Sequence, residues 1–204
     1  MNTALIRSAT DRDAEEIQAI YAVIVRTTVT SFEVEPPTTG EMRERMNAVQ
    51  QRFPWLVWEQ DGEVAGYVYA SAHRERAAYQ WSVNVSAYIH EQYRRRGVGR
   101  ALYTSLFALL RLQGFYNAYA GVTLPNPGSV GLHEAMGFEP VGVYQKVGYK
   151  FGAWHDVGWW SMALRPHDVK PSAPLLLAAI ARTPEWQRAI DSGLAIGAPG
   201  SRPN

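Results

Sequence analysis

A run of arginines that leads into two glycines carries the clearest chemistry in this sequence. Residues 94–99 read Arg-Arg-Arg-Gly-Val-Gly, and apolar residues at helical spacing follow from Val98 to Leu110. A glycine-containing loop at the start of a helix presents free backbone N–H groups, and the helix dipole there favours an anion. Glycine also lacks the Cβ atom that would hold a phosphate away from the backbone. The segment predicts a diphosphate-binding loop, with a solvated basic patch beside a glycine turn as the alternative.

The common nucleotide-binding motifs do not describe this loop. The P-loop pattern GxxxxGK[ST] is absent from the sequence, and Ala101-Leu102 follow Gly99 where the dinucleotide pattern GxGxxG needs a third glycine. A phosphate ligand of another kind is therefore expected.

The elements that would position this loop follow from the hydrophobic pattern. Thr10 with Asp13, and Thr38 with Glu41, have the spacing of helix-starting capping boxes. The turn Asp61-Gly62 between apolar runs is typical of a β-hairpin. The predicted elements are a strand at 5–9, helices at 11–26 and from 38 to before Pro54, hairpin strands at 55–59 and 64–70, a strand at 80–89, a helix at 97–114, a strand at 116–122, a short helix ending at 136, and two strands between 138 and 164.

This order of elements mixes hairpins with strand-helix-strand crossovers. It predicts an α+β fold with a mixed sheet and helices on its faces. Residues 1–165 form the predicted domain. Residues 166–204 are predicted to be a C-terminal extension, with a linker, a helix within 175–190 that is either amphipathic or broken at Pro184, and a disordered end over residues 195–204.

Composition limits the classes of function. The chain has 204 residues, 47% of them hydrophobic, which suits one domain with one core. Twenty basic and nineteen acidic side chains leave a net charge of +1, so no general attraction to nucleic acid or to an anionic membrane is expected. The absence of cysteine excludes disulfides and a cysteine nucleophile. With no apolar signal core and no long apolar run, a cytoplasmic protein is expected.

A family resemblance adds to this reading. Arg94-x-x-Gly97-x-Gly99 resembles the Q/R-x-x-G-x-G/A signature of the GNAT superfamily of N-acetyltransferases, whose loop holds the diphosphate of acetyl-CoA. Residues 4–164 are similar to the phosphinothricin and methionine sulfoximine N-acetyltransferase branch. The similar segments, in the family's order, are residues 53–57, 61–66, 124–126, 133–138 and 154–158.

The resemblance implies a fold and a cosubstrate site. The implied GNAT fold has a mixed, mostly antiparallel central sheet of about six to seven strands, splayed at the acetyl-CoA site and flanked by about four helices. The strand ending at Ile89 would leave backbone groups free for the pantetheine and thioester, as an added strand would use them. Asn126 matches an asparagine that contacts the CoA arm, although a helix cap is an equal reading of that residue. The implied acetyl-CoA contacts are Tyr88, Ile89, His90, Arg94, Arg95, Arg96, Gly97, Val98, Gly99, Arg100 and Asn126.

Two residues are candidates for proton transfer. His133 stands where the branch carries a histidine and where much of the superfamily carries a tyrosine acid, so the resemblance implies that it protonates the departing thiolate. Asn84 stands where the branch carries a glutamate base, and an amide cannot accept that proton. Asn84 could order a water that relays the proton, or His133 or Glu33 could act as the base. Alternatively, the substrate amine could have a pKa low enough to need little assistance from a base. Loss of catalysis with acyl-CoA binding retained is a further alternative.

The acceptor pocket is implied by the same resemblance. Its matching residues are Phe32, Arg74, Arg76 and Tyr79, and arginine suits a carboxylate or phosphinate. Read singly, each of these arginines is an ordinary surface residue. Trp154-His155-Asp156 offers two adjacent donors without a third at ligand spacing, so no metal site is predicted.

The sequence thus predicts an acetyl-CoA-dependent N-acetyltransferase that acts on a small amino-acid-like amine by direct transfer. Phosphinothricin and methionine sulfoximine are the sharpest substrate expectation. A different small amine, or a non-catalytic acyl-CoA-binding module, is the alternative. A homodimer is expected, with no nucleic-acid or membrane partner.

Overall fold

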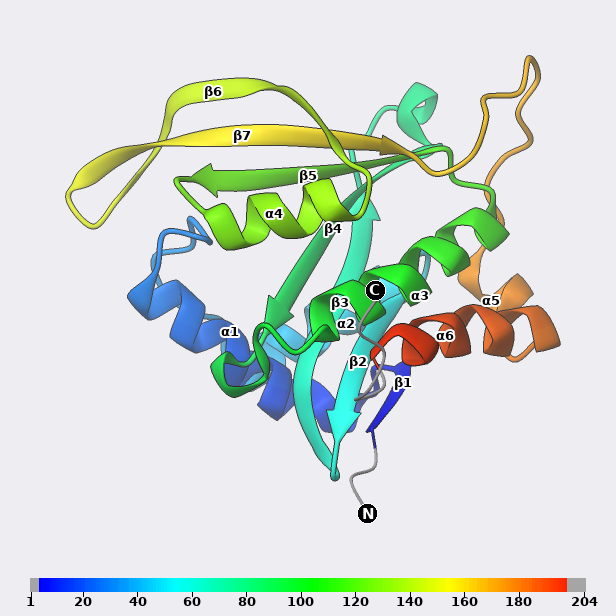
Figure 1. Ribbon diagram of the computed structural model, residues 1–204, viewed down its shortest axis with the longest axis horizontal. Coiled ribbons are helices and arrows are strands. Elements are labelled where there is room, and N and C mark those ends of the chain that lie inside the picture. The colour runs from blue at the N-terminus through cyan, green and yellow to red at the C-terminus, as the bar shows by residue number, and fades with distance from the viewer. Residues whose placement is uncertain (1–3, 198–204) are drawn as a thin grey trace, which may run out of the picture.

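The protein, described here by a computed structural model of residues 4–197, is built on one seven-stranded sheet with the strand order β1-β2-β3-β4-β5-β7-β6 (Figure 1). All neighbouring strands are antiparallel except β4 and β5, which are parallel. The strands are β1 Ala4–Ser8, β2 Trp55–Gln60, β3 Glu63–Ala72, β4 Ser82–Ile89, β5 Asn117–Leu124, β6 Glu139–Lys150 and β7 Ala153–Ala163. The helices are α1 Ala14–Thr27, α2 Thr39–Gln50, α3 Val98–Gln113, α4 Pro127–Ala135, α5 Leu177–Ile180 and α6 Pro184–Gly197. The predicted fold class and order of elements are confirmed.

Local sequence signals account for several of these boundaries. Before α1, the Asp13 carboxylate accepts the backbone N–H of Thr10 at 2.7 Å. At α2, Thr38 Oγ1 accepts the N–H of Glu41 at 3.2 Å, and Glu41 accepts the N–H of Thr38 at 2.7 Å. These pairs satisfy N–H groups that have no partner within the helix. Both predicted helix starts are confirmed.

The predicted hairpin is also present. Asp61 and Gly62 connect β2 to β3, with φ angles of 53° and 92°. Two successive positive φ values define a turn whose twist matches that of the flanking strands. Because β3 pairs with both β2 and β4, this hairpin presents the strand against which β4 is aligned.

The sheet opens between β4 and β5. Their parallel pairing covers only Ser82–Asn84 against Asn117–Tyr119. Beyond these residues β4 continues to Ile89 and β5 to Leu124 without pairing to each other. The splay predicted near Ile89 therefore begins earlier, directly after Asn84.

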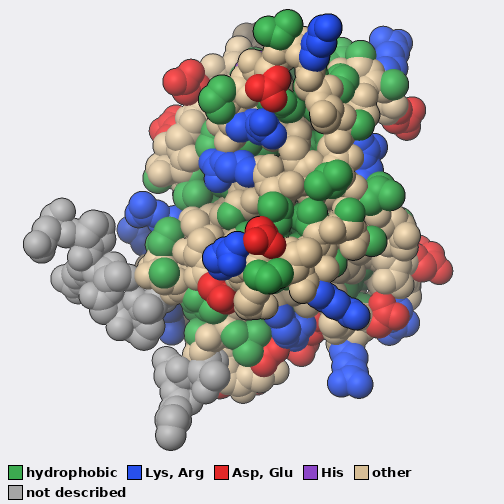
Figure 2. All heavy atoms as spheres, turned by 90° about the vertical axis from the view of Figure 1, so that its right-hand side faces the viewer, with side chains coloured by type: hydrophobic (Ala, Val, Ile, Leu, Met, Phe, Trp, Pro, Cys, Tyr) green, Lys and Arg blue, Asp and Glu red, His purple; other side chains and the backbone are tan. Residues whose placement is uncertain are grey.

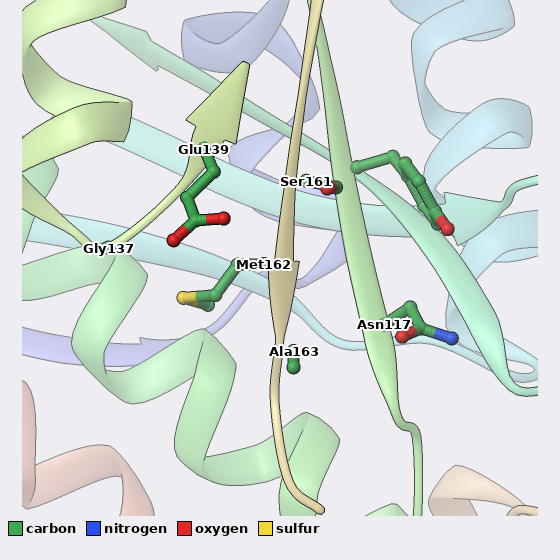
Figure 3. Close-up of a pocket in the computed structure, with 7 residues that line it drawn as sticks. Asn117, Gly137, Glu139, Ser161, Met162 and Ala163 are labelled. Atoms are coloured by element: carbon green, nitrogen blue, oxygen red, sulfur yellow. The ribbon is translucent and has the colours of Figure 1, made fainter. Parts of the chain in front are cut away.

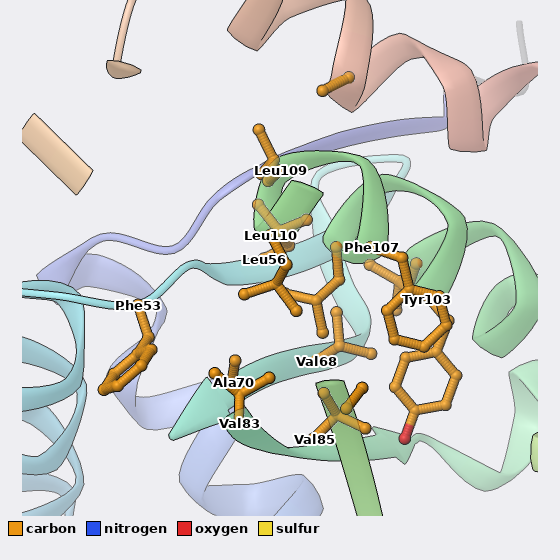
Figure 4. Packing of buried hydrophobic residues seen from close by; sticks show 14 of the residues in the cluster. Phe53, Leu56, Val68, Ala70, Val83, Val85, Tyr103, Phe107, Leu109 and Leu110 are labelled. Atoms are coloured by element: carbon orange, nitrogen blue, oxygen red, sulfur yellow. The ribbon is translucent and has the colours of Figure 1, made fainter. Parts of the chain in front are cut away.

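Two hydrophobic clusters fix the sheet between helical layers. On one face, α3 packs Tyr103 and Leu110 against Leu56, Val68 and Val85 of the central strands (Figure 4). On the other face, α1 and α2 cover the aromatic side chains of β2 and β3, including Trp55 and Tyr67. A fully buried leucine or valine side chain contributes about 1.5–3 kcal/mol. The strands on both sides of the splay are thereby held in place.

The C-terminal helices belong to the same core. Ser105 Oγ donates to the backbone oxygen of Ile190 at 2.6 Å, and Trp186 is buried in the cluster under α3. A Cβ atom at Gly193 would overlap the carbonyl oxygen of Ala101, so α6 approaches α3 at backbone distance. The predicted interruption before Pro184 is present, but the segment is packed against the domain. The predicted disordered end, residues 195–204, is wrong for residues 195–197, which belong to α6. Its remaining residues lie outside the described part of the chain.

The surface mixes charges of both signs. On the face seen in Figure 2, lysine and arginine side chains are interspersed with aspartate and glutamate. Within residues 4–197, none of the helices has the length and apolar character needed to cross a bilayer.

Candidate functional site

The predicted diphosphate loop joins β4 to α3 at the open end of the sheet. Gly97, with φ of 84°, precedes α3 and has no side chain with which to cap it. The first bond of the helix runs from Ala101 N–H to Gly97 O at 2.9 Å. The N–H groups of the first three helical residues, 98–100, therefore have no acceptor within the helix, and they present partial positive charge. This geometry suits an anion.

The two glycines of the loop have different roles. Gly97 needs its freedom for the left-handed backbone, and a Cβ atom there would meet nothing within 4 Å. At Gly99, a Cβ atom would lie 3.1 Å from Leu132 Cδ2. Gly99 therefore permits α3 and α4 to pack closely. We expected both glycines to let a phosphate approach the backbone. The open space at Gly97 fits this expectation, whereas the missing Cβ of Gly99 mainly accommodates Leu132.

The arginines of the loop have exposed side chains. Arg94 Nε donates to the backbone oxygen of Ile89 at 3.1 Å, which ties the loop to the end of β4. The Arg96 guanidinium lies 5.7 Å from the ring centroid of Tyr93, within cation–π range. Arg95 has a positive φ of 59°. These exposed arginine side chains add positive charge near the start of α3.

Only some backbone groups at the end of β4 face the splay. The N–H of His90 donates to Ala65 O at 2.9 Å, so His90 points its backbone toward β3. Because backbone groups alternate sides along a strand, Tyr88 also faces β3, whereas Ile89 and Ala87 face the opening. The register, which pairs Gly66 with Ile89, agrees. Of Tyr88, Ile89 and His90, only Ile89 therefore has its main-chain groups on the side of the splay, where its oxygen already accepts from Arg94. Ala87 lies on the same side and was not among the predicted contacts.

Asn126 caps α4. Its Oδ1 accepts the backbone N–H of Ser129 at 3.1 Å. The capping role weighed for this residue is therefore present, and the amide nitrogen of Asn126 is the group left for a contact with CoA.

His133 is buried on the face of the sheet covered by α3 and α4. Its side chain is 5% exposed, with Nδ1 2.8 Å from the carbonyl oxygen of Ser129 and Nε2 3.0 Å from the Tyr103 hydroxyl. Because a carbonyl only accepts, Nδ1 carries the proton and Nε2 accepts from Tyr103. Burial lowers the pKa of His133 and raises the pKa of Tyr103. The ring is therefore neutral and hydrogen-bonded at both nitrogens.

Asn84 is the last residue of β4 that pairs with β5. Its side chain contacts His73, a residue that was not among the predicted site residues. Asn84 Oδ1 lies 2.9 Å from Nδ1 of His73. The neighbours Val83 and Val85 are buried under α3, so Asn84 points to the opposite face. His73 lies just beyond β3, two residues after Ser71, the partner of Asn84. Only the strand register, which the sequence does not reveal, brings these two residues together.

Both carboxylate oxygens of Glu33 are hydrogen-bonded. Its two oxygens accept from Arg45 at 2.7 and 3.2 Å, and Oε1 also accepts from the Tyr21 hydroxyl at 3.0 Å. The adjacent Phe32 packs on β6, where a Cβ atom at Gly148 would overlap its ring. These contacts join the segment between α1 and α2 to the β6–β7 hairpin.

The other predicted acceptor residues lie in the connection from β3 to β4. Tyr79 contacts His73 edge to face, with ring centroids 6.0 Å apart. Arg74 and Arg76 are exposed in the same connection. The structure thus brings Tyr79 to the His73–Asn84 pair, and Phe32 lies separately on the β6–β7 hairpin.

The segment Trp154-His155-Asp156 serves the β6–β7 hairpin. His155 Nε2 lies 3.0 Å from Lys150 O, and Asp156 Oδ1 accepts the Lys146 N–H at 2.7 Å. Across residues 4–197, no group of three or more histidine, aspartate or glutamate side chains could hold a metal ion.

A surface hollow of about 410 Å³ lies at the opposite end of β5 from Asn126. Glu139 and Met162 lie on one side of β7 and Asn117 on the other (Figure 3). Its lining residues are Asn117, Tyr119, Gly137, Glu139, Ser161, Met162 and Ala163. The hollow reaches the splay only at Tyr119, and the predicted diphosphate loop lies at the start of α3, so the open sheet, and not this hollow, is the candidate active site.

Comparison with known proteins identifies the family of this chain. Residues 6–159 match the family model described as an acetyltransferase (GNAT) domain. A phosphinothricin N-acetyltransferase of Streptomyces viridochromogenes is 39% identical over 170 residues, 81% of this chain and 93% of the relative. An L-methionine sulfoximine/L-methionine sulfone acetyltransferase of Pseudomonas paraeruginosa is 32% identical over 83% of this chain and 99% of its own.

A solved structure shares the fold closely. The GNAT superfamily phosphinothricin acetyltransferase of Sinorhizobium meliloti, in complex with acetyl-CoA, superposes with a TM-score of 0.80 at 34% identity, over 83% of this chain and 94% of that one. The chain therefore belongs to the GNAT acetyltransferase family and is an N-acetyltransferase similar to the phosphinothricin N-acetyltransferases.

Proposed function

We propose that this protein transfers the acetyl group of acetyl-CoA to the primary amine of a small amino-acid-like substrate, of the phosphinothricin or methionine sulfoximine type. The observation that carries the proposal is the pairing of an uncapped helix start at Gly97 with a sheet that opens after Asn84. Relatives that bear these two substrate names are 39% and 32% identical over most of the chain.

The chain's own groups fit the donor. N–H groups 98–100 and the exposed arginines would hold the diphosphate, and the main chain of Ala87 and Ile89 would bind the pantetheine arm as a neighbouring strand does. The amide nitrogen of Asn126 would contact the same arm. Acetyl-CoA supplies the activated acyl group, and the protein orients it in the splay.

The acceptor would enter from the face that carries Asn84 and Tyr79. Arg74 and Arg76, exposed in the connection between β3 and β4, would attract the carboxylate or phosphinate of the substrate. Phe32 would limit the pocket from the β6–β7 side. The substrate must present a neutral amine, so a proton has to leave it before acetyl transfer.

The acid role predicted for His133 stays a prediction. The neutral ring has no N–H at Nε2, and burial disfavours its protonated form. A thiol leaves readily because its ordinary pKa is about 8.5. We propose that His133 mainly fixes α4 against α3 at neutral pH.

We also propose that two copies associate through the β6–β7 hairpin. Large apolar side chains on this ribbon are 50–62% exposed: Val141, Val143, Tyr144, Val147, Tyr149, Phe151 and Trp154. Exposed apolar patches of this kind mark protein interfaces. Trp154→Glu is expected to yield a monomer in sedimentation velocity, whereas Val169→Glu, at a side chain 98% exposed elsewhere, should leave the dimer intact. A wild-type monomer would refute the proposal.

The decisive test of the activity is release of CoA thiol from acetyl-CoA, with the product confirmed by mass. Phosphinothricin and methionine sulfoximine are compared with glycine, polyamines and aminoglycosides. We expect turnover with the first two. Turnover only with the others would refute the substrate class, and acetyl-CoA binding without turnover on any amine would refute the transferase activity.

A further inference from the structure

His73 is held in one orientation by Asn84. Nδ1 lies 2.9 Å from Asn84 Oδ1, and because an amide oxygen only accepts, Nδ1 carries the proton of the neutral ring. Nε2 is then the nitrogen with the free electron pair. In residues 4–197, no hydrogen-bond partner is found for Nε2. This arrangement, with one ring nitrogen tied to a polar group and the other open, is that of a histidine poised to accept a proton.

Aromatic rings fix the plane of the His73 side chain. Tyr119 stacks on it at 4.2 Å between centroids with planes 21° apart, and Trp159 meets it edge on at 6.3 Å. Tyr79 contacts it at 6.0 Å. The titratable groups against the ring are therefore the phenols of Tyr79 and Tyr119, and no charged side chain is among these contacts. Such packing restricts the ring to few orientations, which is what efficient proton transfer requires.

The position of the pair matches the site of reaction in the proposed function. Asn84 is paired with Tyr119 at the last parallel rung before β4 and β5 separate. His73 stacks on that same Tyr119, so the ring lies where the sheet opens. It lies on the face opposite α3, which is the face proposed for the amine.

The other candidate bases are less suitable. Both oxygens of Glu33 accept hydrogen bonds from Arg45, and one accepts a further bond from Tyr21. Both nitrogens of His133 are bonded, and the side chain is 5% exposed. Among these three side chains, only His73 has a basic atom for which the described part of the chain supplies no hydrogen-bond donor.

We infer that His73 is the proton acceptor of the acetyl transfer and that Asn84 is its positioning residue. The inference rests on the proposed function. One N–H bond of the substrate ammonium breaks, its electron pair stays on the amine nitrogen, and the proton forms a new bond to His73 Nε2. The amine then forms the C–N bond as the C–S bond breaks, the sulfur leaves with its electron pair and takes the second amine proton, and His73 returns the first proton to water.

This assignment explains the amide at position 84. A carboxylate there would be a base in its own right, whereas an amide oxygen serves to receive the N–H of His73 and to select the tautomer that leaves Nε2 free. The proton-accepting function is thus transferred from residue 84 of β4 to His73, which directly follows β3 and lies two residues after Ser71, the partner of Asn84.

The primary test compares His73→Phe with His167→Phe. Phenylalanine keeps a ring to stack on Tyr119 but removes the basic nitrogen. His167 is a matched control, because its Nε2 also lies 2.9 Å from an asparagine Oδ1, that of Asn117, and its ring stacks on Tyr116. General base catalysis contributes about 10²–10⁴-fold, so His73→Phe should lose about 100-fold in kcat. His167→Phe should keep wild-type kcat, and both variants should bind acetyl-CoA as the wild type does.

Rescue distinguishes a chemical role from a structural one. Added imidazole should restore turnover to His73→Gly, and Asn84→Glu introduced into His73→Phe should restore it by supplying a carboxylate base. If His73→Phe is poorly folded, His73→Gln provides the same comparison. Wild-type kcat in a folded His73 variant, or loss without rescue by either route, would overturn the inference. Absence of wild-type turnover on every amine would instead refute the proposed function.

Discussion

His73 and His133 lie on opposite faces of the central sheet, and they differ in burial and in the hydrogen bonding of their ring nitrogens. His133 is 5% exposed under α3 and α4, and both of its nitrogens are hydrogen-bonded. His73 is partly exposed on the other face, with one nitrogen held by Asn84. A histidine with both nitrogens occupied resists a change of protonation, whereas one with a single fixed nitrogen is prepared for it. The comparison predicts that His73 serves chemistry and His133 serves stability.

The largest expected effect concerns rate. His73→Phe should lower kcat by about 100-fold and leave Tm nearly unchanged, because its ring packing is retained. His133→Ala should keep kcat within a few-fold of wild type at temperatures where the variant is folded. Steady-state kinetics and thermal unfolding of both variants check this. A kcat loss in His133→Ala that equals the loss in His73→Phe would remove the distinction.

The second effect concerns stability. His133→Ala removes a buried ring and leaves the Tyr103 hydroxyl without its partner, so the free energy of unfolding should fall by about 3 kcal/mol. Tyr103→Phe removes only the hydroxyl and should cost about 1 kcal/mol. Urea unfolding measures both. A His133→Ala variant as stable as the wild type would contradict the buried, doubly bonded geometry.

The third effect concerns pH. Burial lowers the pKa of His133 in the folded protein below the ordinary value of about 6.5 that applies to the unfolded chain. As the pH falls through that value, the unfolded state binds the proton first, so stability is lost on acidification, by up to about 1.4 kcal/mol per pH unit. His133→Asn should show a smaller dependence between pH 7 and 5. If the free energy of unfolding of His133→Asn depends on pH as steeply as that of the wild type, groups other than His133 determine the acid sensitivity.

The smallest expected effect concerns Glu33, the carboxylate that we consider less suitable than His73 as the base. Glu33→Gln removes an ion pair whose side chains are 35% and 46% exposed, and such pairs contribute at most about 1 kcal/mol. Because its carboxylate is already engaged, kcat should change less than about threefold, far less than the 10²–10⁴-fold that general base catalysis contributes. Steady-state assay of the purified variant gives the answer. A kcat loss of about 100-fold would transfer the role of base to Glu33.

The sequence was sufficient for local features and insufficient for pairings across strands. Thr38 and Glu41, or Asp61 and Gly62, are close in the chain, so their chemistry determines a helix start or a turn without help from the rest of the fold. The glycine loop before α3 is local for the same reason, so its place at a helix start was predictable, while its binding of diphosphate stays a prediction. His73 and Asn84 meet only through the register of β3 and β4, and neither residue is informative alone.

Packing of the C-terminal helices was also beyond sequence reasoning. Gly193 looks like an ordinary small residue, yet it permits backbone contact between α6 and the first turn of α3. Gly99 was assigned to phosphate approach, whereas its missing Cβ mainly makes room for Leu132. In both cases the reason for glycine is a neighbour distant in the chain.

The most direct test of the His73 assignment is the pH dependence of kcat/KM in the wild type and in the double variant His73→Phe/Asn84→Glu. The proton acceptor sets the acidic limb of this profile, because the rate falls when it becomes protonated. The account predicts that the acidic limb of the profile moves to lower pH in the double variant, because a carboxylic acid ordinarily has a lower pKa than an imidazolium. A limb at the same pH in both proteins would contradict the assignment of His73.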